Sequence, residues 1–328
     1  MSFQVYIADK RYPAVGLDLL RKTTQTTFLT YLEYGEDSLK EIKNNIKGCD
    51  GLIWNTHHPL TAEILDLAGK ILLLCPQLKV ISSTSTGFDH IDLGEVKKRG
   101  IPLGYARLVL NNSVADVAVG LMIAAARRFK EGVINTESGN WELGAQWRLG
   151  QDITGSTVGI VGLGSIGQAV VRRLKGFDVA KFLYCGRREK PEAKTLGVQR
   201  VSLEQLLAES DYVILACPLT DETKELINAN TLKMMKKTAV LVNIARGGLV
   251  EQDALYEALK ENRIFAAGLD VVTPEPIPKD HKILSLPNCF VTPHMGGATM
   301  SNLNTKAIIA AKNILLGLEG KPLLYPVI

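Results

Sequence analysis

The sequence of 328 residues has little cysteine, few aromatic residues, almost no excess of one charge and no long apolar run. Its five cysteines stand far apart, at Cys49, Cys75, Cys185, Cys217 and Cys289. This spacing excludes a small disulfide scaffold and a cysteine-ligated metal centre, and it indicates reduced thiols in a reducing compartment. We therefore expect no metal site and no disulfide.

Basic and acidic residues nearly balance, with 38 of the first, 34 of the second and a formal net charge of +4. This balance argues against nucleic acid as a partner. The first residues show no basic segment followed by an apolar stretch, so a signal peptide is not expected. The longest uncharged apolar stretch, residues 117–126, is about half of what a bilayer requires. We therefore expect a cytoplasmic protein that does not bind membranes.

Short apolar segments typical of β-strands alternate with segments of helical length along the whole chain. This alternation predicts parallel α/β layers, and the segments form two series, which indicates two domains. The first series has strands at 3–8, 51–54, 79–82 and 101–103, with helices near 13–24, 38–47 and 61–73. The second has strands at 157–161, 180–184, 212–216, 239–243 and 266–269.

Between the two series, the sequence predicts one long helix over residues 114–130. Ser113 can cap it, and Asp116 stands three residues on as the partner in a capping box. Apolar residues cover nearly every face before Arg127 and Arg128, so we expect the helix to be buried between the two domains.

The segment that follows, residues 136–152, has no clear periodicity and carries Trp141 and Trp147. Two large aromatic side chains on an irregular segment suit either a surface loop or a contact between protein copies.

The clearest motif is a glycine-rich turn between an apolar strand and a helix. Gly162 permits the tight turn, Gly164 lets the backbone approach a pyrophosphate, and Gly167 lets the helix pack close to the strand. The first turn of the helix then offers free N–H groups to phosphates. This arrangement predicts a dinucleotide-binding site.

The end of the next strand indicates which dinucleotide binds. Sites for NAD usually carry an acidic residue there, about 20 residues after the glycines, to accept hydrogen bonds from the ribose. Here the acid is missing after Tyr184, and Arg187 and Arg188 follow instead. Guanidinium groups suit a 2′-phosphate, so the sequence predicts NADP(H) as the preferred cofactor and NAD(H) as the alternative.

Three further stretches place polar residues directly after apolar strands. Because ligands bind at the carboxyl ends of strands in open α/β sheets, all three stretches could converge on one crevice. They span residues 242–248, 267–276 and 291–299.

These motifs, in this order and together with the loop at 85–92, resemble the D-isomer-specific 2-hydroxyacid dehydrogenases over essentially the whole chain. Within that family the chain is most similar to the glyoxylate/hydroxypyruvate reductases, on the Gly-Arg-Arg run at 186–188 and the Pro-Glu-Pro-Ile-Pro segment at 274–278. The resemblance implies NADPH-dependent reduction of glyoxylate and hydroxypyruvate to glycolate and D-glycerate.

The resemblance also implies a domain organisation. Both domains would be Rossmann-like α/β layers, with a nucleotide-binding domain (108–297) inserted into a discontinuous, flavodoxin-like substrate domain (1–107 plus 298–328). Family members usually form homodimers through the nucleotide domain and its arm. This favours an oligomer contact for Trp141 and Trp147.

The family's catalytic roles fall on three residues of this sequence. Arg246 would hold the substrate carboxylate and polarise the carbonyl group, a task that suits its planar fork. His294 would be the general acid that protonates the carbonyl oxygen as hydride arrives. Glu275 would pair with His294, orient its ring and favour its charged form.

Other residues would bind the substrate and the cofactor. Backbone groups of Thr86 and Gly87 would bind the substrate carboxylate, together with Arg246 and His294, and Asp270 would lie near the nicotinamide carboxamide. The remaining cofactor-binding residues implied by the resemblance are Gly162, Gly164, Ser165, Ile166, Gly167, Arg187, Arg188, Pro218, Ile244 and Gly296.

One residue departs from the family pattern. Close members often have arginine where Ser165 stands, and serine can still hydrogen-bond a phosphate but adds no charge. This leaves the predicted recognition of the 2′-phosphate mainly to Arg187 and Arg188.

Two alternatives remain open from the sequence. The chain could be another dehydrogenase of this family, of the 3-phosphoglycerate or D-lactate type. It could also be a dinucleotide-sensing scaffold similar to a corepressor, because a fold by itself does not specify catalysis.

Overall fold

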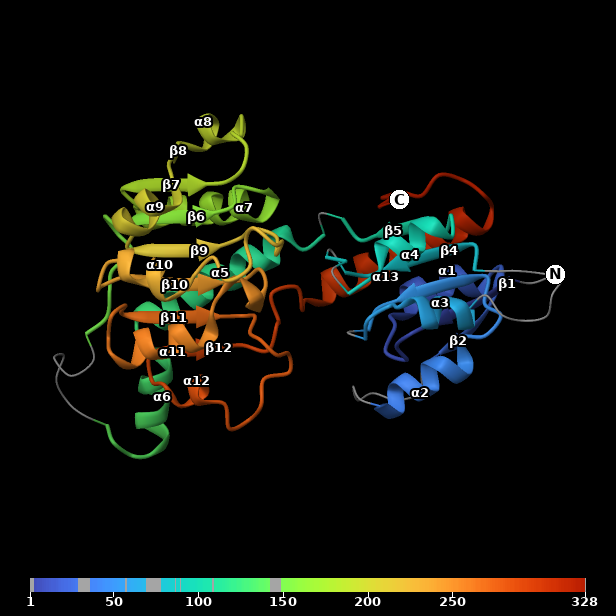
Figure 1. Cartoon of the computed structure of the whole chain (residues 1–328), viewed down its shortest axis with the longest axis horizontal. Coiled ribbons are helices and arrows are strands. Elements are labelled where there is room, and N and C mark those ends of the chain that lie inside the picture. Colours follow the sequence, from blue (N-terminus) through green and yellow to red (C-terminus); the bar gives the residue numbers. More distant parts are fainter. Residues whose placement is uncertain are drawn as a thin grey trace. The chain divides into compact units, whose positions relative to one another are not determined.

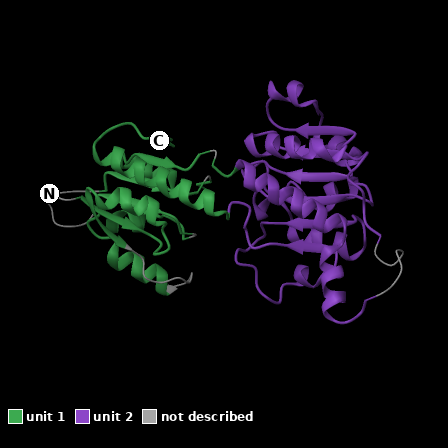
Figure 2. Ribbon diagram, turned by 180° about the vertical axis from the view of Figure 1, so that it is seen from behind, with its two compact units in different colours: residues 1–110, 298–328 green, residues 111–297 purple. Residues whose placement is uncertain are grey.

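The computed structural model describes residues 3–28, 36–56, 58–68, 78–85, 87–88, 90–107, 109–141 and 149–327. The chain divides into two compact units (Figure 2). Unit 1 comprises Met1–Leu110 and Ala298–Ile328, and unit 2 comprises Asn111–Gly297. Each unit contains a parallel sheet with helices, so the predicted fold class is confirmed. The units divide after Leu110, three residues beyond the boundary expected from the sequence.

Unit 1 contains a five-stranded parallel sheet in the order β2-β1-β3-β4-β5. Its strands are β1 (Phe3–Ile7), β2 (Thr24–Phe28), β3 (Gly51–Trp54), β4 (Val80–Ser83) and β5 (Leu103–Tyr105). Its helices are α1 (Ala14–Arg21), α2 (Glu36–Asn45), α3 (Ala62–Ala68), α4 (Leu93–Lys98) and α13 (Met300–Leu318).

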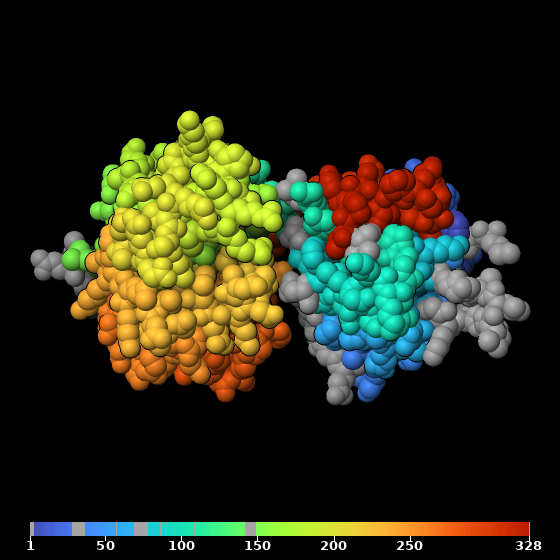
Figure 3. Space-filling model, turned by 45° about the horizontal axis from the view of Figure 1, so that its top comes forward, coloured from blue at the N-terminus to red at the C-terminus, as the bar shows by residue number. Residues whose placement is uncertain are grey.

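The C-terminal helix α13 completes the core of unit 1. Its residues Ala307, Ala311 and Ile314 are fully or almost fully buried against strand and helix residues of the N-terminal segment. A side chain at Gly16 of α1 would lie 2.8 Å from the carbonyl oxygen of Ala307, so the two helices approach closely. Figure 3 shows the C-terminal segment, in red, beside residues near 100, where the N–H of Val327 donates to the carbonyl of Leu103.

Unit 2 contains a seven-stranded parallel sheet in the order β12-β11-β10-β9-β6-β7-β8 (Figure 1). Its strands are β6 (Thr157–Val161), β7 (Lys181–Cys185), β8 (Val198–Arg200), β9 (Tyr212–Leu215), β10 (Val240–Asn243), β11 (Ala266–Leu269) and β12 (Cys289–Val291). The strand order reverses between β6 and β9, and the carboxyl ends of strands at such a reversal form the usual ligand crevice of these sheets.

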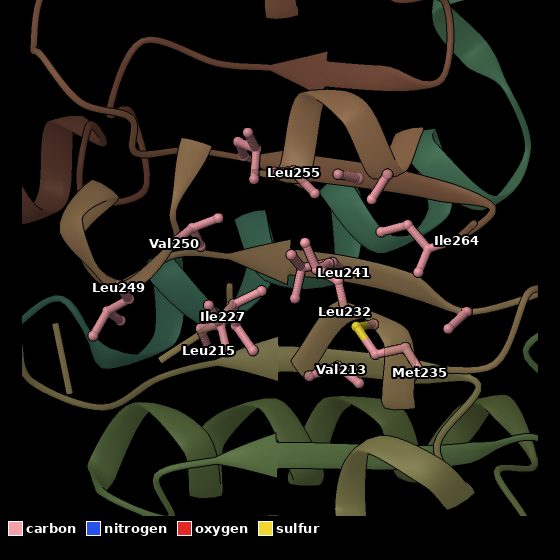
Figure 4. Close-up of a cluster of buried hydrophobic side chains, with 14 of the residues drawn as sticks. Val213, Leu215, Ile227, Leu232, Met235, Leu241, Leu249, Val250, Leu255 and Ile264 are labelled. Carbon is pink, nitrogen blue, oxygen red and sulfur yellow. The ribbon is translucent and has the colours of Figure 1, made fainter. Parts of the chain in front are cut away.

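The helices of unit 2 cover this sheet. They are α5 (Asn111–Ala126), α6 (Phe129–Glu137), α7 (Ser165–Leu174), η1 (Lys175–Phe177), α8 (Glu192–Leu196), α9 (Leu203–Glu209), α10 (Ala229–Met234), η2 (Gly247–Leu249), α11 (Gln252–Lys260) and α12 (Lys282–Ser285). Figure 4 shows part of the core, where Val213 and Leu241 of the sheet meet Leu232 of α10 and Leu255 of α11. This packing fixes the strands whose carboxyl ends carry the candidate site.

The prediction of a single helix over 114–130 was wrong. α5 begins at Asn111, so Ser113 lies inside its first turn rather than at its cap. The carboxylate of Asp116 pairs instead with Arg173 of α7. α5 ends at Ala126, and Arg128 adopts a left-handed conformation (φ 56°) before α6 begins. The burial expected for α5 is present, and it comes from packing on α7 and the sheet within unit 2.

Four cysteines, Cys49, Cys185, Cys217 and Cys289, are free thiols, and Cys75 lies outside the described residues. Burial raises the pKa of Cys49, Cys185 and Cys289 to about 12 and that of Cys217 to about 11. These thiols are therefore protonated and unreactive at neutral pH. Among the described residues, no helix is both long and apolar enough to cross a membrane.

Candidate active site

The glycine-rich turn joins β6 to α7 and requires glycine at two positions. Gly162 has a φ of +98°, and a side chain there would lie 2.8 Å from the carbonyl oxygen of Ala216. A side chain at Gly167 would clash with the carbonyl oxygen of Gly162. The turn can therefore form only because both positions lack a Cβ atom.

Gly164 caps the start of α7 and faces open space. No heavy atom lies within 4 Å of the position that a Cβ atom would take at Gly164. The backbone there is extended, and Ser165, the first residue of α7, is exposed. The helix start thus presents unpaired N–H groups and the positive end of its dipole to an accessible space. These features fit the pyrophosphate of a dinucleotide.

The loop after β7 carries two exposed arginines, Arg187 and Arg188, and no acidic residue before them. Arg200 donates hydrogen bonds to the carbonyl oxygens of Gly186 (3.1 Å) and Arg187 (3.4 Å), which hold the loop backbone. The pKa of Glu222 lies below its usual value, chiefly because the Thr220 hydroxyl donates to it and partly because of the charge of Arg187. The loop after β7 thus exposes two basic residues, with no acidic residue before them.

Arg246 follows β10 in a turn that neighbouring residues hold in place. The buried side chain of Asn243 donates to the carbonyl of Arg246 (2.9 Å) and accepts from the N–H of Ala245 (3.1 Å). A side chain at Gly247 would clash with the carbonyl of Val272, so this turn packs tightly against the segment after β11. The sequence did not indicate this role for Asn243.

Asp270 is 2% exposed and follows directly after β11. Its carboxylate accepts hydrogen bonds from the Thr292 hydroxyl (2.6 Å) and from the N–H groups of Met295 (2.8 Å) and Gly296 (2.7 Å). Its carbonyl oxygen accepts from the N–H of His294 (2.8 Å). Asp270 therefore holds the turn that carries His294, a role that the sequence did not predict.

His294 and Glu275 form the candidate catalytic pair. The Nδ1 atom of His294 lies 2.7 Å from Oε2 of Glu275, and Oε1 of Glu275 accepts from the N–H of Val272 (3.1 Å). The hydrogen bond with Glu275 raises the pKa of His294 above its usual value, against the opposing effects of burial and of the Arg246 charge. Within the described residues, Nε2 has no hydrogen-bond partner, which leaves it available to a substrate.

Known proteins with similar sequences show which family this chain belongs to. The sequence model described as "D-isomer specific 2-hydroxyacid dehydrogenase, NAD binding domain" matches residues 119–296. The glyoxylate reductase/hydroxypyruvate reductase of Homo sapiens is 45% identical over 316 residues, which are 96% of this chain and 94% of that protein. The chain belongs to the D-isomer specific 2-hydroxyacid dehydrogenase family.

Solved structures resemble this dehydrogenase over its whole length. The TT0316 protein from Thermus thermophilus is 37% identical with a TM-score of 0.89, over 99% of this chain and 100% of that chain. An NADPH-dependent glyoxylate/hydroxypyruvate reductase from Sinorhizobium meliloti, in complex with NADP and malonate, is 26% identical with a TM-score of 0.83, over 100% of this chain and 97% of that one. This dehydrogenase is accordingly an NAD(P)-dependent oxidoreductase.

In this dehydrogenase, unit 2 gathers most of the residues that the sequence singled out. Ile166 lies in α7, Pro218 follows β9, and Ile244 follows β10, all at the carboxyl edge of the sheet. Gly87 follows β4 in unit 1, and Thr86 lies outside the described residues. Trp141 is exposed, whereas Trp147 also lies outside the described residues.

Proposed function

We propose that this dehydrogenase reduces glyoxylate and hydroxypyruvate to glycolate and D-glycerate with NADPH as the hydride donor. The observation that carries the proposal is the pairing of His294 with Glu275 on the same sheet edge as Arg246. Support also comes from the names of the human relative and of the Sinorhizobium meliloti structure.

Arg246 binds the carboxylate of the 2-keto acid in this proposal. Its guanidinium group presents several N–H donors in one plane, which matches a carboxylate and polarises the neighbouring carbonyl group. The Asn243 side chain and the packing of Gly247 against Val272 hold the backbone of this turn. The substrate is therefore oriented before any bond changes.

His294 protonates the carbonyl oxygen from its Nε2 atom. Glu275 accepts from Nδ1, fixes the ring orientation and stabilises the imidazolium form that the reduction consumes. When bound, the reduced nicotinamide supplies the hydride to the carbonyl carbon. His294 then takes up a proton from solvent before the next cycle.

The preference for NADPH rests on Arg187 and Arg188. Both are exposed after β7, where an acidic residue would repel a 2′-phosphate, and the contacts of Arg200 hold the backbone of their loop. A phosphate dianion between two guanidinium groups forms charge-assisted hydrogen bonds that a ribose hydroxyl cannot form equally well.

The proposed substrate class predicts a ranking of catalytic efficiencies. Arg246 recognises the carboxylate that every 2-keto acid has, so selectivity must come from groups that face C3. A site that binds the C3 hydroxyl rejects pyruvate, because a polar group of the protein would then stay unpaired. With NADPH, kcat/KM should be higher for hydroxypyruvate than for pyruvate or 3-phosphohydroxypyruvate. A higher kcat/KM for pyruvate or 3-phosphohydroxypyruvate would overturn the assignment as a hydroxypyruvate reductase. The assignment to the dehydrogenase family would still hold.

The Glu275–His294 pair predicts a change in pH dependence. Reduction needs protonated His294, so the rate falls as the pH rises through its pKa. Because Glu275 raises that pKa, the substitution Glu275→Gln should move the alkaline limb of kcat/KM for hydroxypyruvate to lower pH. Glu257→Gln, at an exposed position of α11, is the control and should leave the limb in place. If the alkaline limb of the pH profile stays in place in Glu275→Gln, the pairing of Glu275 with His294 does not set the pH dependence of the reduction.

A homodimer joined through α6 and the segment after it is the proposed assembly. Phe129, Val133, Ile134 and Trp141 are each about half to three-quarters exposed, at 51%, 53%, 48% and 72%. An apolar surface of this kind, concentrated on one short helix and its continuation, is typical of a protein interface.

This interface predicts the oligomeric state of surface variants. The wild-type protein should elute as a dimer in size-exclusion chromatography with light scattering, and Val133→Glu should shift it toward the monomer. Met234→Glu, at another exposed apolar position of unit 2, should remain dimeric. A monomeric wild type, or dimers that tolerate Val133→Glu, would argue against α6 as the interface.

A further inference from the structure

Gln252, the first residue of α11, forms a paired contact with the backbone of Thr273. Its amide nitrogen donates to the carbonyl oxygen of Thr273 (2.8 Å), and the N–H of Thr273 donates to its amide oxygen (3.0 Å). A residue in a β-strand exchanges both of its backbone bonds with a neighbouring strand in the same way. The side chain of Gln252 thus takes the place of a strand neighbour for Thr273, although it stands 21 residues earlier in the chain.

The segment that carries Glu275 has no regular structure of its own. Residues 273–276 are exposed and belong to no helix or strand. The residues on either side of Glu275 are prolines, which have no N–H group to donate. The position of the Glu275 carboxylate therefore depends on how Thr273 and the preceding Val272 are held.

Gln252 can hold this segment because α11 is anchored in the core of unit 2. Leu255 and Leu259 of the same helix are buried. The amide of Gln252 also has one orientation, because its oxygen accepts from Thr273 and its nitrogen therefore faces Nε2 of His281 at 3.2 Å. An anchored helix and an oriented amide together fix the backbone of Thr273.

Thr273 is connected to the catalytic pair through its two neighbours in the chain. The N–H of Val272 donates to Oε1 of Glu275 (3.1 Å), and Oε2 of the same carboxylate lies 2.7 Å from Nδ1 of His294. One oxygen of Glu275 thus contacts the backbone of its own segment, and the other contacts the imidazole. A shift of the backbone at Thr273 would move the carboxylate relative to His294.

We propose that Gln252 is a positioning residue that holds the Glu275 carboxylate against the His294 ring. This inference rests on the proposed function, in which His294 donates the proton and Glu275 stabilises its charged form. Gln252 acts through the backbone of Thr273 and contacts neither substrate nor cofactor.

The charges around His294 determine what a loss of position would do. The hydrogen bond and charge of Glu275 raise the pKa of His294, Asp270 adds a smaller effect in the same direction, and Arg246 and burial lower it. Gln252 is uncharged, so a neutral substitution there leaves all of these charges in place. A looser contact between Glu275 and His294 would then lower the pKa of His294.

The test measures the pKa of His294 by NMR titration of the full-length protein, labelled in histidine, without substrate or cofactor. The chain has five histidines, and the spectrum of His294→Asn identifies the signal of His294. The pKa should fall in Gln252→Met, which keeps a long uncharged side chain but removes both bonds with Thr273. It should fall at least as far in Glu275→Gln. Because no turnover is needed, the result does not depend on hydroxypyruvate being the substrate.

The double variant shows whether Gln252 acts through Glu275. Gln252→Met combined with Glu275→Gln should give the same pKa of His294 as Glu275→Gln alone, because there is then no carboxylate to position. In assays of hydroxypyruvate reduction, Gln252→Met should lower kcat by up to about 10²-fold, the cost of a small misplacement of a reacting group. KM should change little, because Arg246 still binds the carboxylate.

Gln205→Met is the matched control. Gln205 lies in α9 of the same unit, and its side chain donates to Glu209 (2.7 Å), so the same substitution breaks a hydrogen bond elsewhere. The pKa of His294 should not change in this variant. Circular dichroism and thermal unfolding check that each variant folds. If Gln252→Met unfolds, Gln252→Ala removes the same two bonds and should give the same shift.

An unchanged pKa of His294 in Gln252→Met, beside a lowered one in Glu275→Gln, would overturn the proposal and leave the proposed function intact. A double variant whose pKa lies below that of Glu275→Gln would overturn it too, because Gln252 would then act by another route. An unchanged pKa in Glu275→Gln would instead contradict the catalytic pair, and with it both the proposed mechanism and the role of Gln252.

Discussion

Replacing His294 with alanine should lower kcat for hydroxypyruvate reduction by about 10²–10⁴-fold, the usual contribution of a well-placed proton donor. The imidazolium supplies the proton that the carbonyl oxygen needs as hydride arrives, and Glu275 keeps the ring in position 2.7 Å away. Binding of NADPH, measured by fluorescence titration, should persist, because the glycine turn and the two loop arginines are unchanged. Near-normal turnover would remove His294 from the mechanism.

A second variant separates the chemistry of His294 from its backbone conformation. The residue has a φ of 51°, a left-handed conformation that asparagine tolerates better than alanine. His294→Asn should therefore preserve the turn that Asp270 holds, yet lose activity about as strongly as His294→Ala. Recovery of activity in the asparagine variant would mean that the alanine variant fails through a distorted turn.

The sequence predicts the inner strands of both sheets well, and the outermost strands poorly. The strands at 51–54, 157–161 and 266–269 were predicted with the residues that the structure gives them. Strands of this kind are buried on both faces, so they appear as short continuous apolar runs. The edge strands β2 (Thr24–Phe28) and β8 (Val198–Arg200) were not predicted, because they carry polar and exposed residues.

The end of α5 near Arg128 also could not be predicted from the sequence. Apolar residues continue on both sides of it, so periodicity alone gives no reason to end α5 at Ala126. The side chains of Arg128 and Glu131 form a close ion pair across the start of α6, and Glu131 is 6% exposed. This ion pair lies at the break between α5 and α6, where Arg128 is in the left-handed conformation.

At the candidate site, the residue types could be predicted from their positions after strands and from the family resemblance, but their partners could not. Asp270 is the clearest case, because its carboxylate contacts backbone groups 25 and 26 residues further along the chain. Asn243 is similar, since its contribution is to hold the backbone of Arg246. Contacts with backbone atoms leave no pattern of residue types, so only the structure displays them.

Replacing Arg187 and Arg188 together with alanine should weaken NADPH far more than NADH. Each guanidinium that pairs with the 2′-phosphate contributes about 1.5–3 kcal/mol through charge-assisted hydrogen bonds. Since about 1.4 kcal/mol corresponds to tenfold in affinity, the ratio of KM for NADPH to KM for NADH should rise by at least about tenfold. Steady-state kinetics with hydroxypyruvate and each cofactor measure this ratio.

The control for this double variant removes the same charge elsewhere in unit 2. Lys194→Ala combined with Lys237→Ala changes two exposed basic residues, so any general effect of net charge on a polyanionic cofactor appears in both variants. Only the arginine variant should change the ratio between the two cofactors. Because Ser165 contributes no charge at the glycine turn, the two arginines are the main candidates for cofactor selection. An equal loss with NADPH and NADH would mean that Arg187 and Arg188 do not recognise the 2′-phosphate.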